Sequence, residues 1–139
     1  MRRLDAYSHA PPPMTRIELL LAAFDGIVSR LRQARELLEQ DETAKAEPLL
    51  LRSQRIVLEL YSGIDLRFGQ IPENMRKLYL YVLGCIGMGP ELDLSAALDV
   101  LQNIRDGLES IRDKATQMER SGELSPLSEQ VQLLRNIVA

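Results

Sequence analysis

Side chains that could carry out chemistry are few and far apart in this sequence. The chain has one histidine, His9, and one cysteine, Cys85. His9 stands before three consecutive prolines and has no other imidazole with which to build a metal site. Cys85 lies among hydrophobic residues, without a second histidine or a nearby cationic group to activate it. This setting favours a buried structural thiol over a nucleophile.

The acidic residues and glycines also lack the spacing that catalysis or cofactor binding requires. No glutamate stands in the Glu-x-x-His pattern of di-iron helical bundles. Gly87 and Gly89 are followed by Pro90 and are not preceded by a strand, unlike the glycines of a phosphate-binding loop. The sequence therefore predicts no catalytic residues, no metal and no cofactor, and we do not expect an enzyme.

Composition narrows the classes of protein further. The chain has 139 residues, of which 45% are hydrophobic and 27% are charged, with a formal net charge of −3. This length predicts one domain that can fold without disulfides or metals. The slight negative charge argues against a nucleic-acid partner. No hydrophobic run reaches the ~18 residues that cross a bilayer, and no secretory leader is present, so we expect a cytoplasmic protein without direct membrane insertion.

Hydrophobic residues recur at helical spacing along most of the chain, and no strand is indicated. Prolines 11–13 end an irregular N-terminal arm, residues 1–13, because they cannot extend a helix backwards. Thr15 and Glu18 have the spacing of a capping box, which predicts a first helix from Thr15 to Gln40. The short connection that follows predicts a second helix lying antiparallel to the first.

The second helix is expected over about Ala44 to Leu66, and Pro48 leaves two possible starts. We favour a start near Thr43 with a distortion at Pro48. The alternative is a start near Glu47, which would place Pro48 in the first turn, where its missing N–H does no harm.

Two further long helices are expected. The third covers about Glu73 to Ile86 and ends at a glycine-rich turn. The fourth begins at the cap Asp93. Its hydrophobic residues step by three and four without a break as far as Met118, and Gly122 is a plausible residue after its end.

A short fifth helix is predicted after the cap Ser125, with Pro126 at its first position. Whether it packs on the bundle, swaps to a neighbouring copy or frays is left open. The expected fold is all-α: an antiparallel four-helix bundle over residues 14–121, an irregular N-terminal arm, and a short extra C-terminal helix within residues 122–139.

Several short motifs occur in an order and at a spacing that resemble a known family. They are Ala6–Tyr7, Phe24–Asp25–Gly26, Ile56–Val57–Leu58–Glu59–Leu60, Gly69–Gln70–Ile71, Leu78–Tyr79–Leu80–Tyr81 and Ile104–Arg105–Asp106–Gly107–Leu108. Together they resemble the flagellin export chaperones of the FliS family over about residues 6–115.

The chain departs from that family pattern at three places, and therefore resembles a divergent member. Leu80 stands where the pattern has an aspartate, and Leu108 where it has a tryptophan. Residues 84–87, Gly-Cys-Ile-Gly, replace an Arg-Arg-Leu step and the Ala-Asn that follows it. These changes leave open whether the client is an ordinary flagellin or another secreted filament protein.

The resemblance implies a helical bundle that holds the C-terminal segment of flagellin. That segment is disordered alone, so binding must bury enough hydrophobic area to offset the cost of ordering it. An apolar groove that accepts helices would serve this purpose. The implied function is an export chaperone that prevents premature polymerisation and helps present its client to the flagellar type III export gate.

The resemblance also suggests client-binding residues: Tyr7, Leu60, Ile64, Leu78, Tyr79, Tyr81, Leu101 and Arg105. Each hydrophobic member could instead be ordinary core. Tyr7 could cover the empty groove, face the export gate, or belong to a frayed terminus. The polar tips of Tyr81 and Arg105 are more discriminating, because on an apolar face they need partners.

Two other functions remain open at this point. One is a helical adaptor or assembly protein that binds a different secreted client. The other is a structural homodimer formed through the last helices. The chaperone itself is expected to be a monomer or a weak homodimer.

Overall fold

The computed structural model describes residues 13–64 and 70–122, and all of its regular structure in these ranges is helical. The predicted all-α fold is confirmed. The five helices are α2 (Arg16–Glu39), α3 (Thr43–Ser62), α4 (Gln70–Ile86), α5 (Leu94–Ser110) and α6 (Arg112–Arg120).

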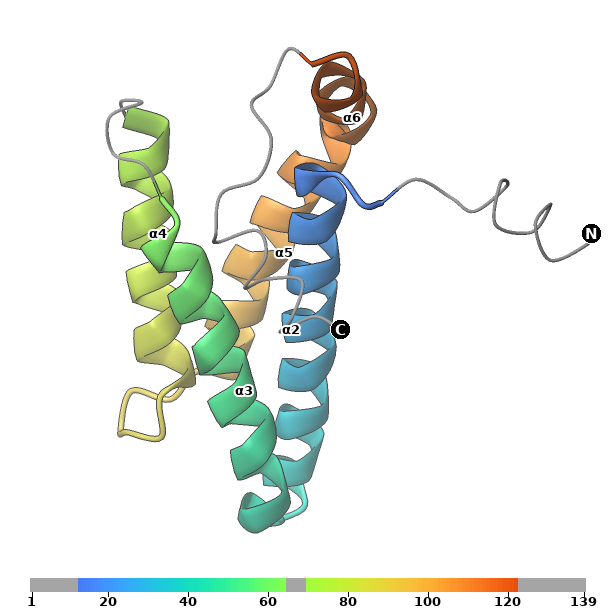
Figure 1. Ribbon diagram of the computed structural model, residues 1–139. Coiled ribbons are helices and arrows are strands. Elements are labelled where there is room, and N and C mark those ends of the chain that lie inside the picture. The colour runs from blue at the N-terminus through green and yellow to red at the C-terminus, as the bar shows by residue number, and fades with distance from the viewer. Residues whose placement is uncertain (1–12, 65–69, 123–139) are drawn as a thin grey trace, which may run out of the picture.

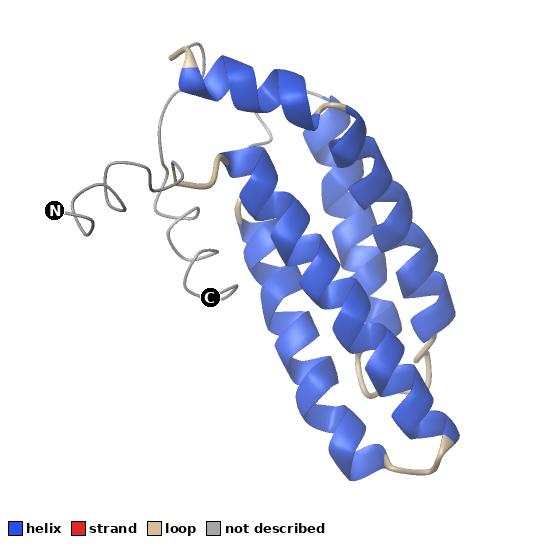
Figure 2. Ribbon diagram, turned by 90° about the vertical axis from the view of Figure 1, so that its right-hand side faces the viewer, coloured by secondary structure: helices blue, strands red, loops and turns tan. Residues whose placement is uncertain are grey.

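Helices α2 to α5 alternate in direction and form an antiparallel bundle (Figure 1). Each packs against the helix before and after it, and α5 returns to pack against α2, which closes the ring. The short helix α6 lies across one end of the bundle, beside the start of α2 (Figure 2).

The core fills the inside of this ring. Its largest fully buried hydrophobic side chains come from all four long helices: Phe24, Ile27, Leu31, Leu50, Ile56, Val57, Val82, Ile86 and Leu101. The rings of Phe24 and Tyr79 meet with their centroids 6.3 Å apart. Removing this hydrophobic surface from water is the main force that holds the helices together.

Most predicted helix starts are confirmed. Glu18 accepts a hydrogen bond from the backbone N–H of Thr15 at 3.2 Å, as expected of a capping box, and a second one from the Thr15 hydroxyl at 2.7 Å. Helix α3 begins at Thr43 and continues past Pro48, which supports the earlier of the two predicted starts. Asp93 caps α5 by accepting a hydrogen bond from Ala96 N–H at 3.1 Å.

Two predicted boundaries were wrong by a few residues. Helix α3 ends at Ser62 rather than Leu66, and the N–H of Gly63 satisfies carbonyls of its last turn. Helix α4 begins at Gln70, three residues before Glu73. Pro72 thus belongs to the first turn, where a proline removes no intrahelical hydrogen bond.

The predicted continuous fourth helix was also wrong, because it is divided into α5 and α6 at Ile111. That residue has φ −111° and ψ 4°, and its side chain is 52% exposed. The preceding turn contains Gly107, a weak helix former, whose carbonyl accepts a hydrogen bond from the Ser110 hydroxyl at 2.6 Å. The chain then turns so that α6 reaches the start of α2.

Two predicted elements lie outside the described residues. They are the N-terminal arm with Tyr7, apart from residue 13, and the fifth helix after Ser125.

Candidate functional site

The predicted site residues lie in three different environments. Leu60, Tyr79 and Leu101 are buried and belong to the core. Burial of the Tyr79 hydroxyl raises its pKa well above the usual range, so this side chain stays neutral. These three residues support the helices and do not present their side chains on the surface.

Ile64, Leu78 and Tyr81 are nearer to solvent. Ile64 is partly buried at the end of α3 and packs against the core. Leu78 and Tyr81 lie on the outer side of α4, 37% and 48% exposed. They are therefore the predicted hydrophobic residues that a partner could touch without opening the bundle.

Helix α3 contributes two exposed leucines that sequence reasoning did not select. Leu51 and Leu58 are more than half exposed, and α4 and the turn after it add Leu80 and Met88. We call these four residues, with Leu78 and Tyr81, the α3/α4 hydrophobic surface; they do not all share one face, because Leu78 and Leu80 are about 200° apart around α4. The spacing of Leu51 and Leu58, two helical turns apart and off the core stripe, was the signal that could have revealed them.

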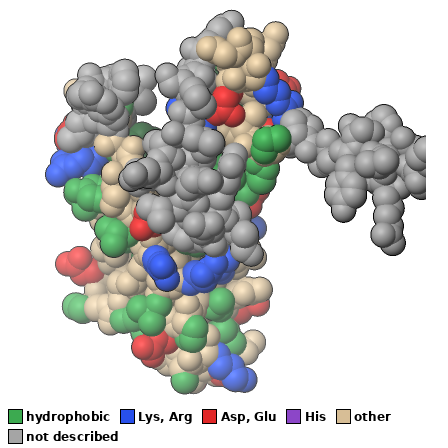
Figure 3. All heavy atoms as spheres, viewed as in Figure 1, with side chains coloured by type: hydrophobic (Ala, Val, Ile, Leu, Met, Phe, Trp, Pro, Cys, Tyr) green, Lys and Arg blue, Asp and Glu red, His purple; other side chains and the backbone are tan. Residues whose placement is uncertain are grey.

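Hydrophobic and charged side chains are interspersed on the face of the bundle that Figure 3 shows. Arg76 of α4 stands over the ring of Tyr61 of α3, with its guanidinium carbon 5.8 Å from the ring centroid. This contact ties α3 to α4 beside the hydrophobic surface.

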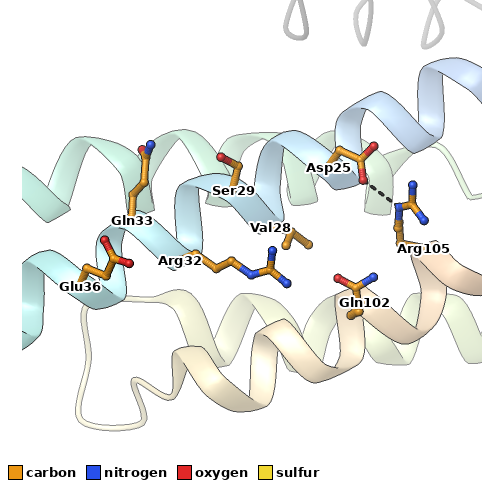
Figure 4. A pocket seen from close by; sticks show the side chains of 8 residues that line it. All are labelled: Asp25, Val28, Ser29, Arg32, Gln33, Glu36, Gln102 and Arg105. Carbon is orange, nitrogen blue, oxygen red and sulfur yellow. Dashed lines mark hydrogen bonds and ion pairs between the residues drawn. The ribbon is translucent and has the colours of Figure 1, made fainter.

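Arg105 lies elsewhere, in a groove between α2 and α5 (Figure 4). Its Nε donates to Asp25 Oδ1 at 2.8 Å, and Glu109 and Asp106 lie within 4 Å of its other nitrogens. The hydrogen bond to Asp25, followed by the negative charges, raises the pKa of Arg105. Asp25 and Arg105 come from two of the resemblance motifs, 80 residues apart, and the sequence did not indicate that they pair.

The groove itself has a volume of about 530 Å³ and is lined mainly by polar side chains. Its lining residues are Asp25, Val28, Ser29, Arg32, Gln33, Glu36, Gln102 and Arg105. These groups can hydrogen-bond the backbone or side chains of a bound segment. The set contains neither an activated nucleophile nor a histidine.

Cys85 is buried and unpaired, as predicted for a structural thiol. A hydrogen bond with Cys85 raises the pKa of the Tyr81 hydroxyl, which lies one turn earlier on α4. Within residues 13–64 and 70–122, no three histidine, cysteine or acidic side chains come together as metal ligands. No helix in the same ranges is long and hydrophobic enough to cross a bilayer.

Comparison with known families identifies the bundle. The family model "Flagellar protein FliS" matches residues 13–121, which include every described helix. The chain belongs to the FliS family. Neither the curated proteins nor the solved structures include a match to it.

Membership of this family gives the protein a general role. FliS proteins are chaperones of flagellar export, with flagellin as their partner in general, and the family is not known for enzymatic activity. The exposed groups of this bundle are therefore candidates for contact with another protein.

Proposed function

We propose that this FliS-family chain is a cytoplasmic export chaperone that binds the disordered C-terminal segment of flagellin. By holding the segment it prevents premature polymerisation and assists delivery to the flagellar type III export apparatus. The observation that carries the proposal is the α3/α4 hydrophobic surface, which stands exposed on a bundle of the FliS family.

Hydrophobic contact is the right chemistry for such a client. A disordered segment loses conformational entropy when it becomes ordered, and burial of hydrophobic area offsets that loss. Leu58 on α3 and Leu78 and Tyr81 on α4 offer this area on adjacent helices. An amphipathic helix that lies along them would bury its apolar face.

The other predicted binding residues have supporting roles in this proposal. Leu60, Tyr79 and Leu101 fix the helices from inside the core, and Ile64 extends the surface at the end of α3. Arg105 offers hydrogen bonds in the α2/α5 groove, where a long client segment could continue around the bundle.

Calorimetric titration with the last ~40 residues of the host's flagellin tests the proposal, together with circular dichroism of the mixture. We expect one-to-one binding, a negative heat-capacity change and a gain of helix. Leu78→Asp should weaken binding at least about tenfold, because it places a charge in a hydrophobic contact. Ile111→Asp is the control, since Ile111 is also an exposed hydrophobic residue, 52% against 37% for Leu78, but lies at the α5–α6 break.

An absence of binding by the wild-type chain would contradict the proposal. Equal weakening by Leu78→Asp and Ile111→Asp would contradict the assignment of the α3/α4 surface. Tyr7→Ala separates two roles of the N-terminal arm. Tighter client binding would indicate that Tyr7 covers the groove, whereas unchanged binding with reduced export would indicate that it faces the export gate.

A further inference from the structure

A notch lies on the surface of α4 at Gly84, beside the connection to α5. Its volume is about 340 Å³, and its lining residues are Leu80, Tyr81, Gly84, Cys85, Glu91 and Asp93. A Cβ atom added at Gly84 would meet no atom within 4 Å. The missing side chain of Gly84 therefore leaves this part of the surface open.

The walls of the notch are hydrophobic. Leu80 and Tyr81 line it with nearly half of each side chain exposed, and the buried Cys85 lines it too. The volume is at the lower end of the range for small-molecule pockets, but the residues here offer few convergent polar groups to orient a small ligand. A hydrophobic side chain presented by another protein suits these walls better.

The rim of the notch is acidic. Glu91 and Asp93 both line it, and no lysine or arginine does. Asp93 is engaged in capping α5, whereas Glu91 has no hydrogen bond or ion pair to any residue that the structure describes. An incoming cation would meet this carboxylate without displacing an existing partner.

We propose that the notch receives one large hydrophobic side chain of the bound client helix, with a lysine or arginine of that helix against Glu91. Because residues three or four apart share one face of a helix, the cation should stand three or four positions from the hydrophobic residue. This inference rests on the proposed function and names the chemistry of the client at one point of contact.

Such a contact would fix the register of the client. Leucines along the α3/α4 hydrophobic surface can accept many hydrophobic side chains, so they do not distinguish one alignment of the segment from the next. The notch adds a shape requirement and a charge requirement at one position. A client shifted by one helical turn would lose the ion pair and leave the notch unfilled.

Filling the notch tests the shape requirement. Gly84→Leu should weaken binding of the flagellin C-terminal segment at least about tenfold in calorimetry. The substitution is compatible with the fold because its Cβ has open space. Gly107→Leu is the matched control: Gly107 is also an exposed helical glycine with nothing within 4 Å of an added Cβ, but it lies on α5 outside the notch.

Reversing the charge tests the second requirement. Glu91→Lys should weaken binding several-fold, and replacing the facing lysine or arginine of the client with glutamate should restore it. Glu39→Lys, an exposed acidic residue in the last turn of α2, is the control.

The outcomes separate the two proposals. If the wild-type chain does not bind flagellin, the proposed function fails and the notch has no client. If the wild type binds, and folded Gly84→Leu and Glu91→Lys bind equally well, only the notch proposal is overturned. Weakening by Gly84→Leu but not by Gly107→Leu, with rescue of Glu91→Lys by the reversed client charge, would support it.

Discussion

The carboxylate of Glu119, in the last turn of α6, binds Arg16, the first residue of α2. Both of its oxygens accept from the backbone N–H of Arg16 at 3.2 Å, and Oε1 also accepts from the side-chain Nε at 2.9 Å. The first N–H groups of a helix have no partner within the helix and carry partial positive charge. Glu119, 103 residues away in the sequence, thus supplies a hydrogen-bond acceptor for the first turn of α2.

Removing this carboxylate should loosen α6. Glu119→Ala is expected to lower the free energy of local opening of α6 by about 1 kcal/mol, the value of a charge-assisted hydrogen bond at a partly exposed site. Amide hydrogen exchange in α6 should then be roughly fivefold faster, while exchange in α3 stays unchanged. Gln117→Ala, at an exposed position of the same helix, should have little effect. Equal protection of α6 in Glu119→Ala would contradict its role as the anchor.

Glu18 should make stability depend on pH in the acid range. Its hydrogen bonds to the side chain and backbone of Thr15, with smaller contributions from Arg120 and Arg112, lower its pKa. The folded state therefore favours the carboxylate. Its stabilisation is fully present above the ordinary pKa of a glutamate and is lost as pH falls through the lowered pKa.

Glu18→Gln should accordingly lower the free energy of unfolding at pH 7 by about 0.5–1 kcal/mol, as expected for half of a capping box. Urea denaturation of both proteins at several pH values measures the difference. It should shrink towards zero at pH values below the lowered pKa. A difference that stays constant across the acid range would exclude ionisation of Glu18 as its cause.

Tyr79 should behave as a core residue, although it was predicted to bind the client. Its side chain is 4% exposed and packs against Phe24. Tyr79→Ala is expected to cost about 3 kcal/mol, the usual loss for a buried aromatic side chain. Tyr79→Phe keeps the ring and should change both stability and client binding little. Weaker client binding by a stably folded Tyr79→Phe would show instead that the hydroxyl is used in recognition.

Gly84 and Gly107 should both be replaceable by alanine with a gain in stability. Each lies inside a helix, where glycine costs about 0.5–1 kcal/mol relative to alanine, and neither position is crowded. Thermal or urea unfolding should show a similar increase for the two variants. Only Gly84→Ala should also weaken binding of the client, because its methyl group enters the notch. A loss of stability in either variant would mean that a Cβ meets an obstacle there.

Local sequence signals predicted the four long helices well. Phe24, Ile27 and Leu31 recur at helical spacing, and residues that make such a stripe are indeed the buried ones. Caps such as Thr15 and Asp93 depend on neighbours three residues away, so they too were visible in the sequence.

The division at Ile111 was not predicted, because Gly107 weakens the turn before it but the direction of the chain after Ile111 also depends on long-range contacts. The hydrophobic spacing continues smoothly through this residue, whereas the position of α6 depends on contacts such as Arg16–Glu119 and Thr15–Thr116. The pairing of Arg105 with Asp25 was likewise not predicted, because it forms only when α5 returns beside α2.

The candidate site was predictable only in part. Hydrophobic spacing places Leu60 in the core stripe of α3 and Leu58 outside it, but the site residues were chosen from the family motifs, and one motif contains both leucines. The notch at Gly84 was harder still, because it is formed by a missing side chain and by acidic residues of the following turn.

The attachment of α6 gives two parts of the protein opposite responses to ionic strength. No side chain of α6 is buried, and its contacts with α2 include the ion pairs Arg16–Glu119 and Arg120–Glu18. Added salt screens these charges, whereas sulfate or phosphate strengthens the hydrophobic packing of α2 to α5. Concentrated sulfate should therefore weaken the attachment of α6 to α2 while it stabilises the bundle of α2 to α5.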